Sequence, residues 1–429
     1  MSDLEQILMK MKKQSALLAS LSGDTKNLAL RKIADNLRKN KTRIIEENLS
    51  DIKIAQSENL QDTLLKRLLL DDKKIEGLIE GVEDLIKLED PTNKILAVTE
   101  LDKGLVLTKK SVPIGVIGVI FESRPDALIQ ISTLCIKSGN CVILKGGREA
   151  ARTNRILADI VVESIESVGE EFENSLYLLE TREEVSAMLK YDKYINLVIP
   201  RGSNQFVSYI KKNSLIPVLG HADGICHLYV DSDADIDTAV EITFDSKTQY
   251  VAACNALETL LVNETIAGKF LPALKRELDK KDVVIKGDKK TKEILKDVED
   301  ATEEDWSTEY LDYILSIKIV KNVDEAIEHI NKYGSGHTDS IVSKNSKNCD
   351  KFTALVDSAG AFVNCSTRFS DGFRYGFGAE VGISTNKIHA RGPVGLDGLV
   401  IYKYILQGES HIVEDYSSGK KKFVHREIS

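Results

Sequence analysis

The sequence lacks a long apolar run, a secretion signal and an excess of basic residues. None of its apolar runs approaches the roughly 20 residues that a membrane helix needs, and its first residues form neither the basic nor the apolar part of a signal peptide. Lysine and arginine number 58 against 67 aspartates and glutamates, a net charge of −9, whereas a nucleic-acid partner requires a basic face. We therefore expect a cytoplasmic protein that binds neither membranes nor nucleic acids.

The sequence also lacks paired cysteines, paired histidines and the glycine fingerprint of many dinucleotide-binding proteins. Its six cysteines are scattered without a C-x-x-C pair, which predicts reduced thiols rather than a disulfide framework or a zinc ribbon. No two histidines stand four residues apart, so no metal site is expected. No G-x-G-x-x-G occurs, so the sequence does not support an ordinary Rossmann cofactor site.

The chain does contain enough apolar residues for more than one core. Of its 429 positions 42% are hydrophobic, which predicts two or three domains. Helical periodicity extends from residue 4 to about residue 88. From residue 114 to 220, apolar β-branched runs alternate with helical segments, a pattern typical of a parallel α/β sheet. A change of rhythm near Gly220 predicts a domain boundary.

Other segments give local predictions. Residues 96–113 predict a hairpin that turns at Asp102-Lys103-Gly104. Residues 231–244 predict a helix and residues 399–406 a strand. Residues 409–429 predict a polar, partly loose tail.

Cys254 is the candidate nucleophile. It follows Gln249-Tyr-Val-Ala-Ala and precedes the largely apolar run from Leu257 to Val262, which predicts a helix or turn leading into a buried strand. An unpaired cysteine among alanine and valine is also typical of a small buried hydrophobic residue. The choice of a nucleophile therefore depends on the loops that accompany it.

Several loops combine glycine or polar residues with arginine or lysine at the predicted ends of strands. One strand ends at Glu122-Ser-Arg-Pro-Asp126, the next at Lys145-Gly-Gly-Arg148, and a third at Pro200-Arg-Gly-Ser-Asn204. Open α/β sheets bind ligands at the carboxyl ends of their strands, and glycine ahead of a helix admits a phosphate. A plain strand-to-helix turn remains the alternative for residues 145–148. The stretch 363–395 is rich in glycine and arginine, which favours a functional loop over a segment of the hydrophobic core.

Three of these stretches carry a family resemblance. The run from Val320 to Ile341, the loop 121–126 and the stretch 363–395 resemble the gamma-glutamyl phosphate reductase family, whose fold is similar to that of the aldehyde dehydrogenases. The resemblance covers nearly the whole chain. It implies an α/β, aldehyde-dehydrogenase-like fold and a homo-oligomer, either a dimer or a tetramer.

The resemblance also implies a division of the chain. Residues 1–95 and 114–220 would form a Rossmann-like NADPH-binding domain, and residues 221–395 an α/β catalytic domain that carries the thiol. Residues 96–113 and 396–429 would form a small β oligomerisation element.

Site residues follow from the same resemblance. Cys254 occupies the place of the family's nucleophile, and Ser123 the place where aldehyde dehydrogenases have an asparagine at the oxyanion site. Val218 stands where those enzymes have the glutamate that activates water. The implied cofactor-binding residues, for NADPH or NADP⁺, are Lys145, Gly146, Gly147, Arg148, Arg201, Gly202, Ser203 and Glu309. Lys145 would contact the adenosine ribose, Gly202-Ser203 the pyrophosphate, and Glu309 the nicotinamide ribose.

The implied reaction is the NADPH-dependent reduction of L-glutamyl 5-phosphate to L-glutamate 5-semialdehyde, through a cysteine thioester, in proline biosynthesis. It would be consistent with a functional association with a glutamate 5-kinase. A cation or a helix N-terminus is expected to lower the pKa of the Cys254 thiol. The expected substrate-binding residues are Arg124, His221, Asn255, Arg368, Arg374 and Arg391. Surface ion pairs for the arginines, and structural roles for His221 and His337, remain open.

Two other functions remain open. One is a hydrolytic or CoA-acylating aldehyde dehydrogenase with the same fold and thiol, against which Val218 weighs in the hydrolytic case. The other is a structural protein that keeps the fold without the chemistry, against which Cys254 and the cationic loops weigh.

Overall fold

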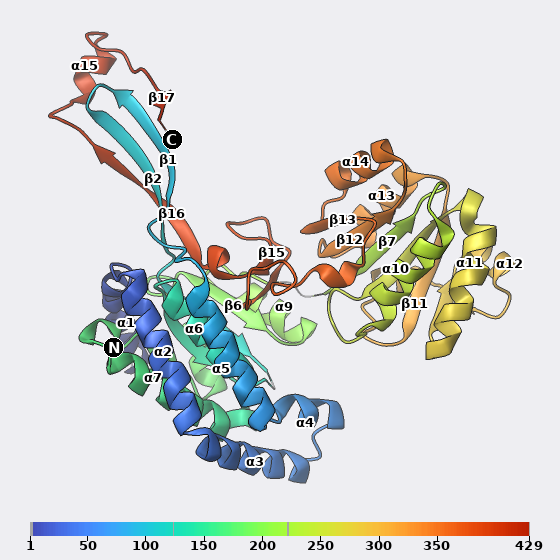
Figure 1. Ribbon diagram of the computed structural model, residues 1–429, viewed down its shortest axis with the longest axis horizontal. Coiled ribbons are helices and arrows are strands. Elements are labelled where there is room, and N and C mark those ends of the chain that lie inside the picture. The colour runs from blue at the N-terminus through green and yellow to red at the C-terminus, as the bar shows by residue number, and fades with distance from the viewer. Residues whose placement is uncertain (1–2, 123, 221–222, 429) are drawn as a thin grey trace.

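The computed structural model describes residues 3–122, 124–220 and 223–428. The chain forms two α/β lobes and a projecting β arm, as Figure 1 shows. The expected aldehyde-dehydrogenase-like α/β fold with parallel sheets is confirmed. Among the described residues, no helix combines the length and the apolar character that a membrane span requires.

The first lobe contains a four-stranded parallel sheet in the order β5-β4-β3-β6. Its strands are β3 (Val116–Phe121), β4 (Cys141–Lys145), β5 (Leu176–Leu178) and β6 (Leu197–Arg201). All six residues of β3 are buried, as the run of β-branched residues predicts for a strand covered on both faces. The sheet is therefore packed between helices, and its carboxyl ends are left to carry the loops of interest.

Amphipathic helices make up the rest of this lobe. In α2 the buried residues Leu30, Ile33 and Leu37 recur at helical spacing and join one core with the sheet. Ser22 caps this helix by accepting a hydrogen bond from the Thr25 N–H, and Asp71 caps α5 in the same way. The helices are α1 (Asp3–Leu18), α2 (Gly23–Lys39), α3 (Lys41–Ser57), α4 (Asp62–Leu68), α5 (Asp72–Lys87), α6 (Asp126–Lys137), α7 (Ala151–Glu166), α8 (Arg182–Met188) and α9 (Asn204–Asn213).

The second lobe contains a seven-stranded parallel sheet in the order β10-β9-β11-β8-β7-β12-β13. Every residue of β8, Leu257–Asn263, is buried, so the predicted strand after Cys254 is present. The other strands are β7 (Cys226–Val230), β9 (Val284–Gly287), β10 (Glu299–Asp300), β11 (Ile314–Val320), β12 (Thr338–Val342) and β13 (Gly360–Val363). The helices are α10 (Ile236–Thr248), α11 (Glu264–Leu278), α12 (Lys289–Ile294), α13 (Val323–Tyr333) and α14 (Ser346–Leu355).

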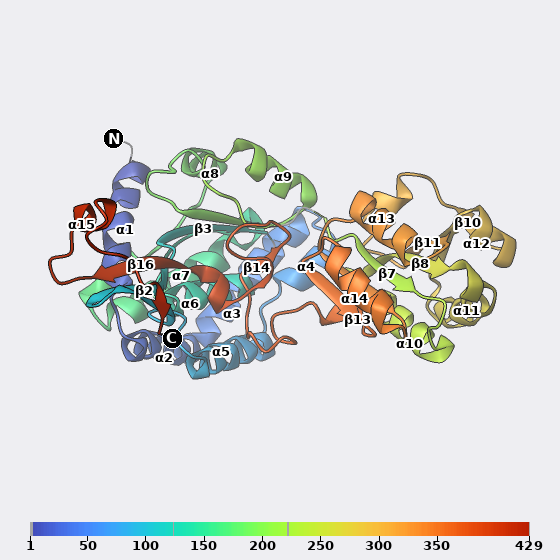
Figure 2. The same cartoon turned by 90° about the horizontal axis from the view of Figure 1, so that it is seen from above.

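The arm is an antiparallel sheet in the order β16-β2-β1-β17. The predicted hairpin is present as β1 (Ile95–Asp102) and β2 (Leu105–Pro113), with Gly104 at a φ of +75° in the turn. The predicted strand near residue 400 is β16 (Val400–Gln407), which pairs with β2 along its whole length. The arm projects from the first lobe in Figure 1, and in the view from above in Figure 2 it overlaps that lobe.

Two sequence predictions need correction, and one can be made more specific. The helix expected from residue 231 begins at Ile236, because Asp235 caps it and Asp231 accepts hydrogen bonds from Tyr229 and Asn348 instead. The tail, predicted to be polar and partly loose, contains α15 (Val413–Ser417) and β17 (Arg426–Glu427), which pairs with β1. The segment 379–399 spans the end of the expected catalytic domain, 221–395, and the start of the expected oligomerisation element, 396–429. Its apolar side chains Val381, Val394, Leu396 and Leu399 pack instead in the core of the first lobe. It holds the hairpin of β14 (Gly382–Ser384) and β15 (Gly392–Val394).

Candidate functional site

Cys254 lies in a turn directly before β8, at the boundary between the lobes, and is half-buried. A hydrogen bond from the Ala256 N–H to the Ala253 carbonyl closes the turn, with a donor–acceptor distance of 2.9 Å. Gly224 packs against it so tightly that an added Cβ would lie 2.1 Å from the Cys254 carbonyl oxygen. A side chain at position 224 would therefore displace the backbone that holds the thiol.

Charged groups from both lobes act on this thiol. Burial raises the pKa of Cys254 to about 12, the carboxylates of Glu309 and Glu380 act in the same direction, and the Arg201 guanidinium opposes them. The cation expected from the sequence is thus present, but burial and the carboxylates outweigh it. The backbone N–H of Cys254 hydrogen-bonds its own sulfur, which also lowers the thiol pKa.

Arg201 is the last residue of β6, and burial lowers its pKa. Its Nη1 donates to the Glu380 carbonyl at 3.5 Å, and its charge reaches the thiol. The sequence grouped Arg201 with the cofactor loop, whereas the structure places it beside the candidate nucleophile. Its role in cofactor binding stays a prediction.

The other predicted arginines separate into two groups. Arg368 donates from Nε to Gln249 Oε1 at 2.9 Å, five residues before Cys254, and interacts electrostatically with the thiol. Arg374 supports the same loop through a 2.6 Å hydrogen bond to the Arg368 carbonyl. By contrast, Arg124 and Arg391 form ion pairs with neighbouring aspartates, Asp126 at 3.0 Å and Asp357 at 3.2 Å.

Four remaining residues of the predicted catalytic, substrate and proton-transfer set have different outcomes. Asn255 donates from Nδ2 to the Ser370 carbonyl at 2.8 Å, so its side chain ties the loop 366–372 to the turn that carries Cys254. His337 is buried, and its Nδ1 lies 2.9 Å from Thr338 Oγ1. Ser123 and His221 lie outside the described residues.

The predicted pyrophosphate loop donates a backbone hydrogen bond to a carboxylate of the protein itself. The Ser203 N–H, at the start of α9, donates to Glu122 Oε2 at 3.2 Å, and an added Cβ on Gly202 would lie 2.5 Å from that same oxygen. The next residue, Asn204, donates from Nδ2 to Glu309 Oε2 at 3.2 Å across the lobe boundary. The loop expected at the pyrophosphate and the glutamate expected at the nicotinamide ribose are therefore neighbours.

Glu309 precedes β11, in a loop held by a second carboxylate. Burial raises the pKa of Glu309, although hydrogen bonds from Asn204 and the Gly224 backbone oppose the shift. Two residues further on, Leu311 adopts a φ of +54°, and its N–H donates to Glu258 Oε1 at 3.2 Å. Glu258 lies in β8 and forms a fully buried ion pair with Lys247 at 2.6 Å. A strained residue and a buried pair thus fix the Glu309 loop to the strand that follows Cys254.

The Lys145 loop is only partly as expected. Lys145 ends β4, is nearly buried, and donates from Nζ to the Gly146 carbonyl, and burial lowers its pKa. Arg148 points elsewhere: its side chain is 84% exposed and pairs with Glu58 at 3.2 Å. An added Cβ on Gly146 would lie 2.1 Å from Nδ2 of the buried Asn154, whereas one on Gly147 would meet only the carboxylate end of the Glu149 side chain, at 2.0 Å.

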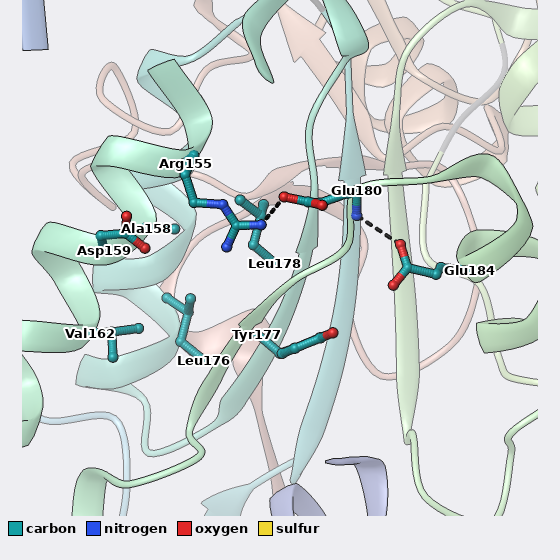
Figure 3. A pocket seen from close by; sticks show the side chains of 9 residues that line it. All are labelled: Arg155, Ala158, Asp159, Val162, Leu176, Tyr177, Leu178, Glu180 and Glu184. Atoms are coloured by element: carbon teal, nitrogen blue, oxygen red, sulfur yellow. Dashed lines mark hydrogen bonds and ion pairs between the residues drawn. The ribbon is translucent and has the colours of Figure 1, made fainter. Parts of the chain in front are cut away.

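A pocket of 220 Å³ lies beside the edge strand of the same sheet, between α7 and α8 (Figure 3). An ion pair between Arg155 and Glu180 crosses it, and the Glu180 N–H donates to Glu184 Oε2 at 2.9 Å. Burial raises the pKa of Tyr177, which lines the pocket from β5. The sequence prediction did not include these residues, because no glycine or motif marks them.

Sequence reasoning also missed Glu380 and Gly224. Both belong to glycine-containing segments that the sequence does single out, 363–395 and 217–224, and Glu380 is an acidic residue within the first of them. The described residues include no group of three or more His, Cys, Asp or Glu side chains suited to a metal ion.

Comparison with known proteins defines the class. The model of the aldehyde dehydrogenase family matches residues 1–293 of this chain. The chain therefore belongs to the aldehyde dehydrogenase family, in agreement with its sheets and thiol position.

Within that family the chain belongs to the gamma-glutamyl phosphate reductases. Proteins of that name from Acetivibrio thermocellus and Ruminiclostridium cellulolyticum are 59% and 57% identical, over 99% and 100% of this chain and 98% of each relative. The crystal structure of gamma-glutamyl phosphate reductase from Thermotoga maritima is 42% identical, with a TM-score of 0.93, covering 96% of this chain and 100% of that one.

Proposed function

We propose that this protein reduces L-glutamyl 5-phosphate to L-glutamate 5-semialdehyde with NADPH, through a thioester on Cys254, as the second step of proline biosynthesis from glutamate. The observation that carries the proposal is the position of the Cys254 thiol among the guanidinium groups of Arg201 and Arg368. Guanidinium groups are suited to phosphate and carboxylate, and a thiol is suited to forming an acyl-enzyme. The names of the full-length relatives support the same substrate.

In the first step the Cys254 thiol loses its proton to solvent, and the sulfur attacks the acyl carbon of the acyl phosphate. The bond from that carbon to the phosphate oxygen breaks, phosphate leaves, and a thioester remains. Because the thiol pKa is about 12, removal of this proton is the step most sensitive to nearby charge. Arg201 and Arg368 are the cations available to the thiol and to the departing phosphate.

Negative charge develops on the acyl oxygen during the attack. A well-aimed donor at such an oxygen contributes roughly 3 to 4 kcal/mol. The backbone N–H of Cys254 belongs to the residue that carries the nucleophile and is the candidate donor to this oxygen. Gly224 holds this backbone in place through its contact with the Cys254 carbonyl.

The residues of the first lobe fit a dinucleotide. The Ser203 N–H already donates to a carboxylate, Lys145 ends the neighbouring strand, and Glu309 is held at the lobe boundary by Asn204. When bound, NADPH supplies the hydride that converts the thioester to the aldehyde. The preference for NADPH over NADH is assigned to Lys145, since Arg148 is paired with Glu58.

Position 218 carries a valine and so provides no carboxylate to activate a water molecule for hydrolysis of the thioester. Val218 forms a bridge with Val198, and its carbonyl accepts a 2.7 Å hydrogen bond from Asn386 Nδ2. An apolar side chain there leaves the thioester intact for reduction. The arm is proposed to join copies of the chain, because β16 exposes Ile401, Tyr402, Tyr404 and Leu406.

The test is reduction of NADP⁺ with glutamate 5-semialdehyde, with and without phosphate. We expect turnover by the wild type to require phosphate, and Cys254→Ala to lower kcat by on the order of 10⁴-fold or more. Cys349→Ala, at a half-buried thiol on α14, is the matched control and is expected to keep the rate. Turnover without phosphate would indicate a hydrolytic enzyme, dependence on CoA an acylating one, and an active Cys254→Ala variant would remove the nucleophile.

A further inference from the structure

Glu380 places a carboxylate beside the thiol, between the two lobes. Its Oε2 accepts a hydrogen bond from the Gly372 N–H at 3.0 Å, and its carbonyl accepts one from Arg201 at 3.5 Å. The Gly372 loop in turn rests on the residue after the nucleophile, since Asn255 donates to the Ser370 carbonyl at 2.8 Å. Glu380 is therefore attached to the first lobe through its backbone and to the Cys254 turn through its side chain.

A local fold brings Glu380 back to Gly372. The Phe377 N–H donates to the Gly372 carbonyl at 2.8 Å, and the Tyr375 N–H to the Asp371 carbonyl at 2.9 Å, so residues 371–377 close on themselves. Gly378 follows at a φ of +75°, a conformation that favours glycine. An added Cβ on Gly372 would lie 3.1 Å from Glu380 Oε2, so the carboxylate is in contact with that backbone.

The charges at this position are largely unmatched by the protein itself. Among the residues that the structure describes, the carboxylate of Glu380 forms no ion pair, and neither do the guanidinium groups of Arg201 and Arg368. Burial raises the pKa of Glu380, and the positive charge of Arg201, which donates to the Glu380 carbonyl rather than to its carboxylate, opposes this shift only in part. Burying a charge without a partner costs free energy, so a ligand that supplies the opposite charge binds more favourably.

The proposed substrate carries matching charges. L-glutamyl 5-phosphate has an α-ammonium group, an α-carboxylate and a phosphate, and only two methylene groups separate the amino-bearing carbon from the one next to sulfur. Arg201 and Arg368 provide the cations for its anionic groups. Of the two carboxylates that act on the thiol, Glu309 is already hydrogen-bonded to Asn204 on the side of the predicted cofactor loop.

We propose that Glu380 receives the α-ammonium group of the substrate and so makes the enzyme specific for an amino-acid semialdehyde over the corresponding aldehyde without an amino group. This inference rests on the proposed function. It assigns to Glu380 a direct contact with the substrate at a distance from the reacting carbon.

The test compares two substrates with two proteins. Wild type and Glu380→Gln are assayed with glutamate 5-semialdehyde and with glutarate semialdehyde, which lacks the amino group. We expect the substitution to lower kcat/KM for the amino substrate by on the order of 30- to 100-fold, the range for a lost hydrogen bond to a charged group. For glutarate semialdehyde, kcat/KM is expected to change by less than about 3-fold, because no ammonium group is there to lose a partner. Asp371→Asn, which neutralises an acidic neighbour of Glu380, is the matched control and is expected to affect both substrates equally.

Equal losses for both substrates would overturn the proposal and assign Glu380 to the thiol or to the fold, and unchanged values for both would also overturn it. A second measurement does not use turnover: L-glutamate is expected to protect the wild-type thiol from iodoacetamide better than glutarate does, and equal protection would contradict the proposal. A wild type that reduces no NADP⁺ with glutamate 5-semialdehyde and phosphate would overturn the proposed function itself. If the wild type is active in this assay but Glu380→Gln leaves kcat/KM unchanged, only the role of Glu380 is overturned.

Discussion

Two regions of this molecule bury charged side chains, and they treat them in opposite ways. Inside the second lobe, Lys247 and Glu258 are both 0% exposed and form an ion pair at 2.6 Å. The Asp339 carboxylate is also fully buried and has its partner in the chain, since its Oδ1 lies 3.0 Å from His227 Nδ1. At the lobe boundary, Arg201, Arg368 and Glu380 share the surroundings of one thiol without forming ion pairs among the described residues.

The difference separates structural charge from functional charge. A paired buried charge has its partner in the chain, so its removal is expected to affect folding. An unpaired one beside a nucleophile has its partner in a ligand, so its removal is expected to affect turnover and leave folding nearly unchanged. The experiments below test single charged groups and show whether each one affects the stability of the fold or the reactivity of the site.

The largest effect is expected from breaking the buried pair. Lys247→Met leaves the Glu258 carboxylate buried without its cation, which costs about 3 to 5 kcal/mol in the free energy of unfolding. Burial already raises the pKa of Glu258 to about 7, so this carboxylate depends strongly on Lys247 for its charge. Denaturant unfolding followed by circular dichroism measures the loss.

Two matched variants sharpen this result. Lys290→Met breaks an ion pair with Glu264 that is about half exposed, and it is expected to leave the unfolding midpoint nearly unchanged. The double variant Lys247→Met with Glu258→Leu is expected to recover most of the lost stability, because no unpaired charge remains. Equal effects of Lys247→Met and Lys290→Met would contradict the assignment of the buried pair to folding.

The second effect concerns the pH dependence of the thiol. The pKa of Cys254 is raised to about 12. At any pH below that value, raising the pH by one unit therefore increases the thiolate fraction about 10-fold. Alkylation by iodoacetamide is therefore expected to accelerate about 10-fold per unit from pH 7 to 9.5, without a plateau. A plateau near pH 8 would show a thiol of ordinary or lowered pKa and would contradict the balance of charges described here.

A smaller change is expected from Arg201→Gln. This substitution removes a cation that lowers the thiol pKa, so alkylation is expected to slow by about 3- to 10-fold at each pH while its slope stays the same. The unfolding midpoint should hardly move, since Arg201 forms no ion pair among the described residues. A large loss of stability with unchanged alkylation would place Arg201 with the structural charges.

The same division explains what the sequence could and could not predict. The strand β8 was predictable because the run from Leu257 onward is nearly all apolar, and burial of the whole strand follows from that. The beginning of α10 was not predictable. Asp231 does not cap the helix, because its carboxylate accepts hydrogen bonds from Tyr229 and from Asn348 on another helix. The strand β17 depends on pairing with β1, more than 300 positions earlier, which no local pattern encodes.

For the site, the sequence predicted the loops but not their partners. Cys254 was a candidate from its own stretch as well as from the family resemblance, and Glu309 came from the resemblance alone. Glu380 stood inside a predicted loop without a role. The carboxylate of Glu380 approaches the thiol only because residues 371–377 fold back and the lobe boundary brings Arg201 to its backbone. For Arg148 the sequence predicted a role in cofactor binding, but its side chain pairs with Glu58 on the surface.

The smallest effect is expected for Arg391, a predicted substrate residue with a partner of its own. Its Nη2 donates to the Asp357 carbonyl at 3.1 Å and pairs with the Asp357 carboxylate at 3.2 Å. Because this pair resembles an ordinary surface ion pair, Arg391→Gln is expected to change kcat/KM by less than about 3-fold. Asp357→Asn, which leaves Arg391 in place and removes its partner, is the matched variant. A loss above 30-fold in Arg391→Gln but not in Asp357→Asn would show that the arginine leaves Asp357 for the substrate, and a paired charge would then also be a functional one.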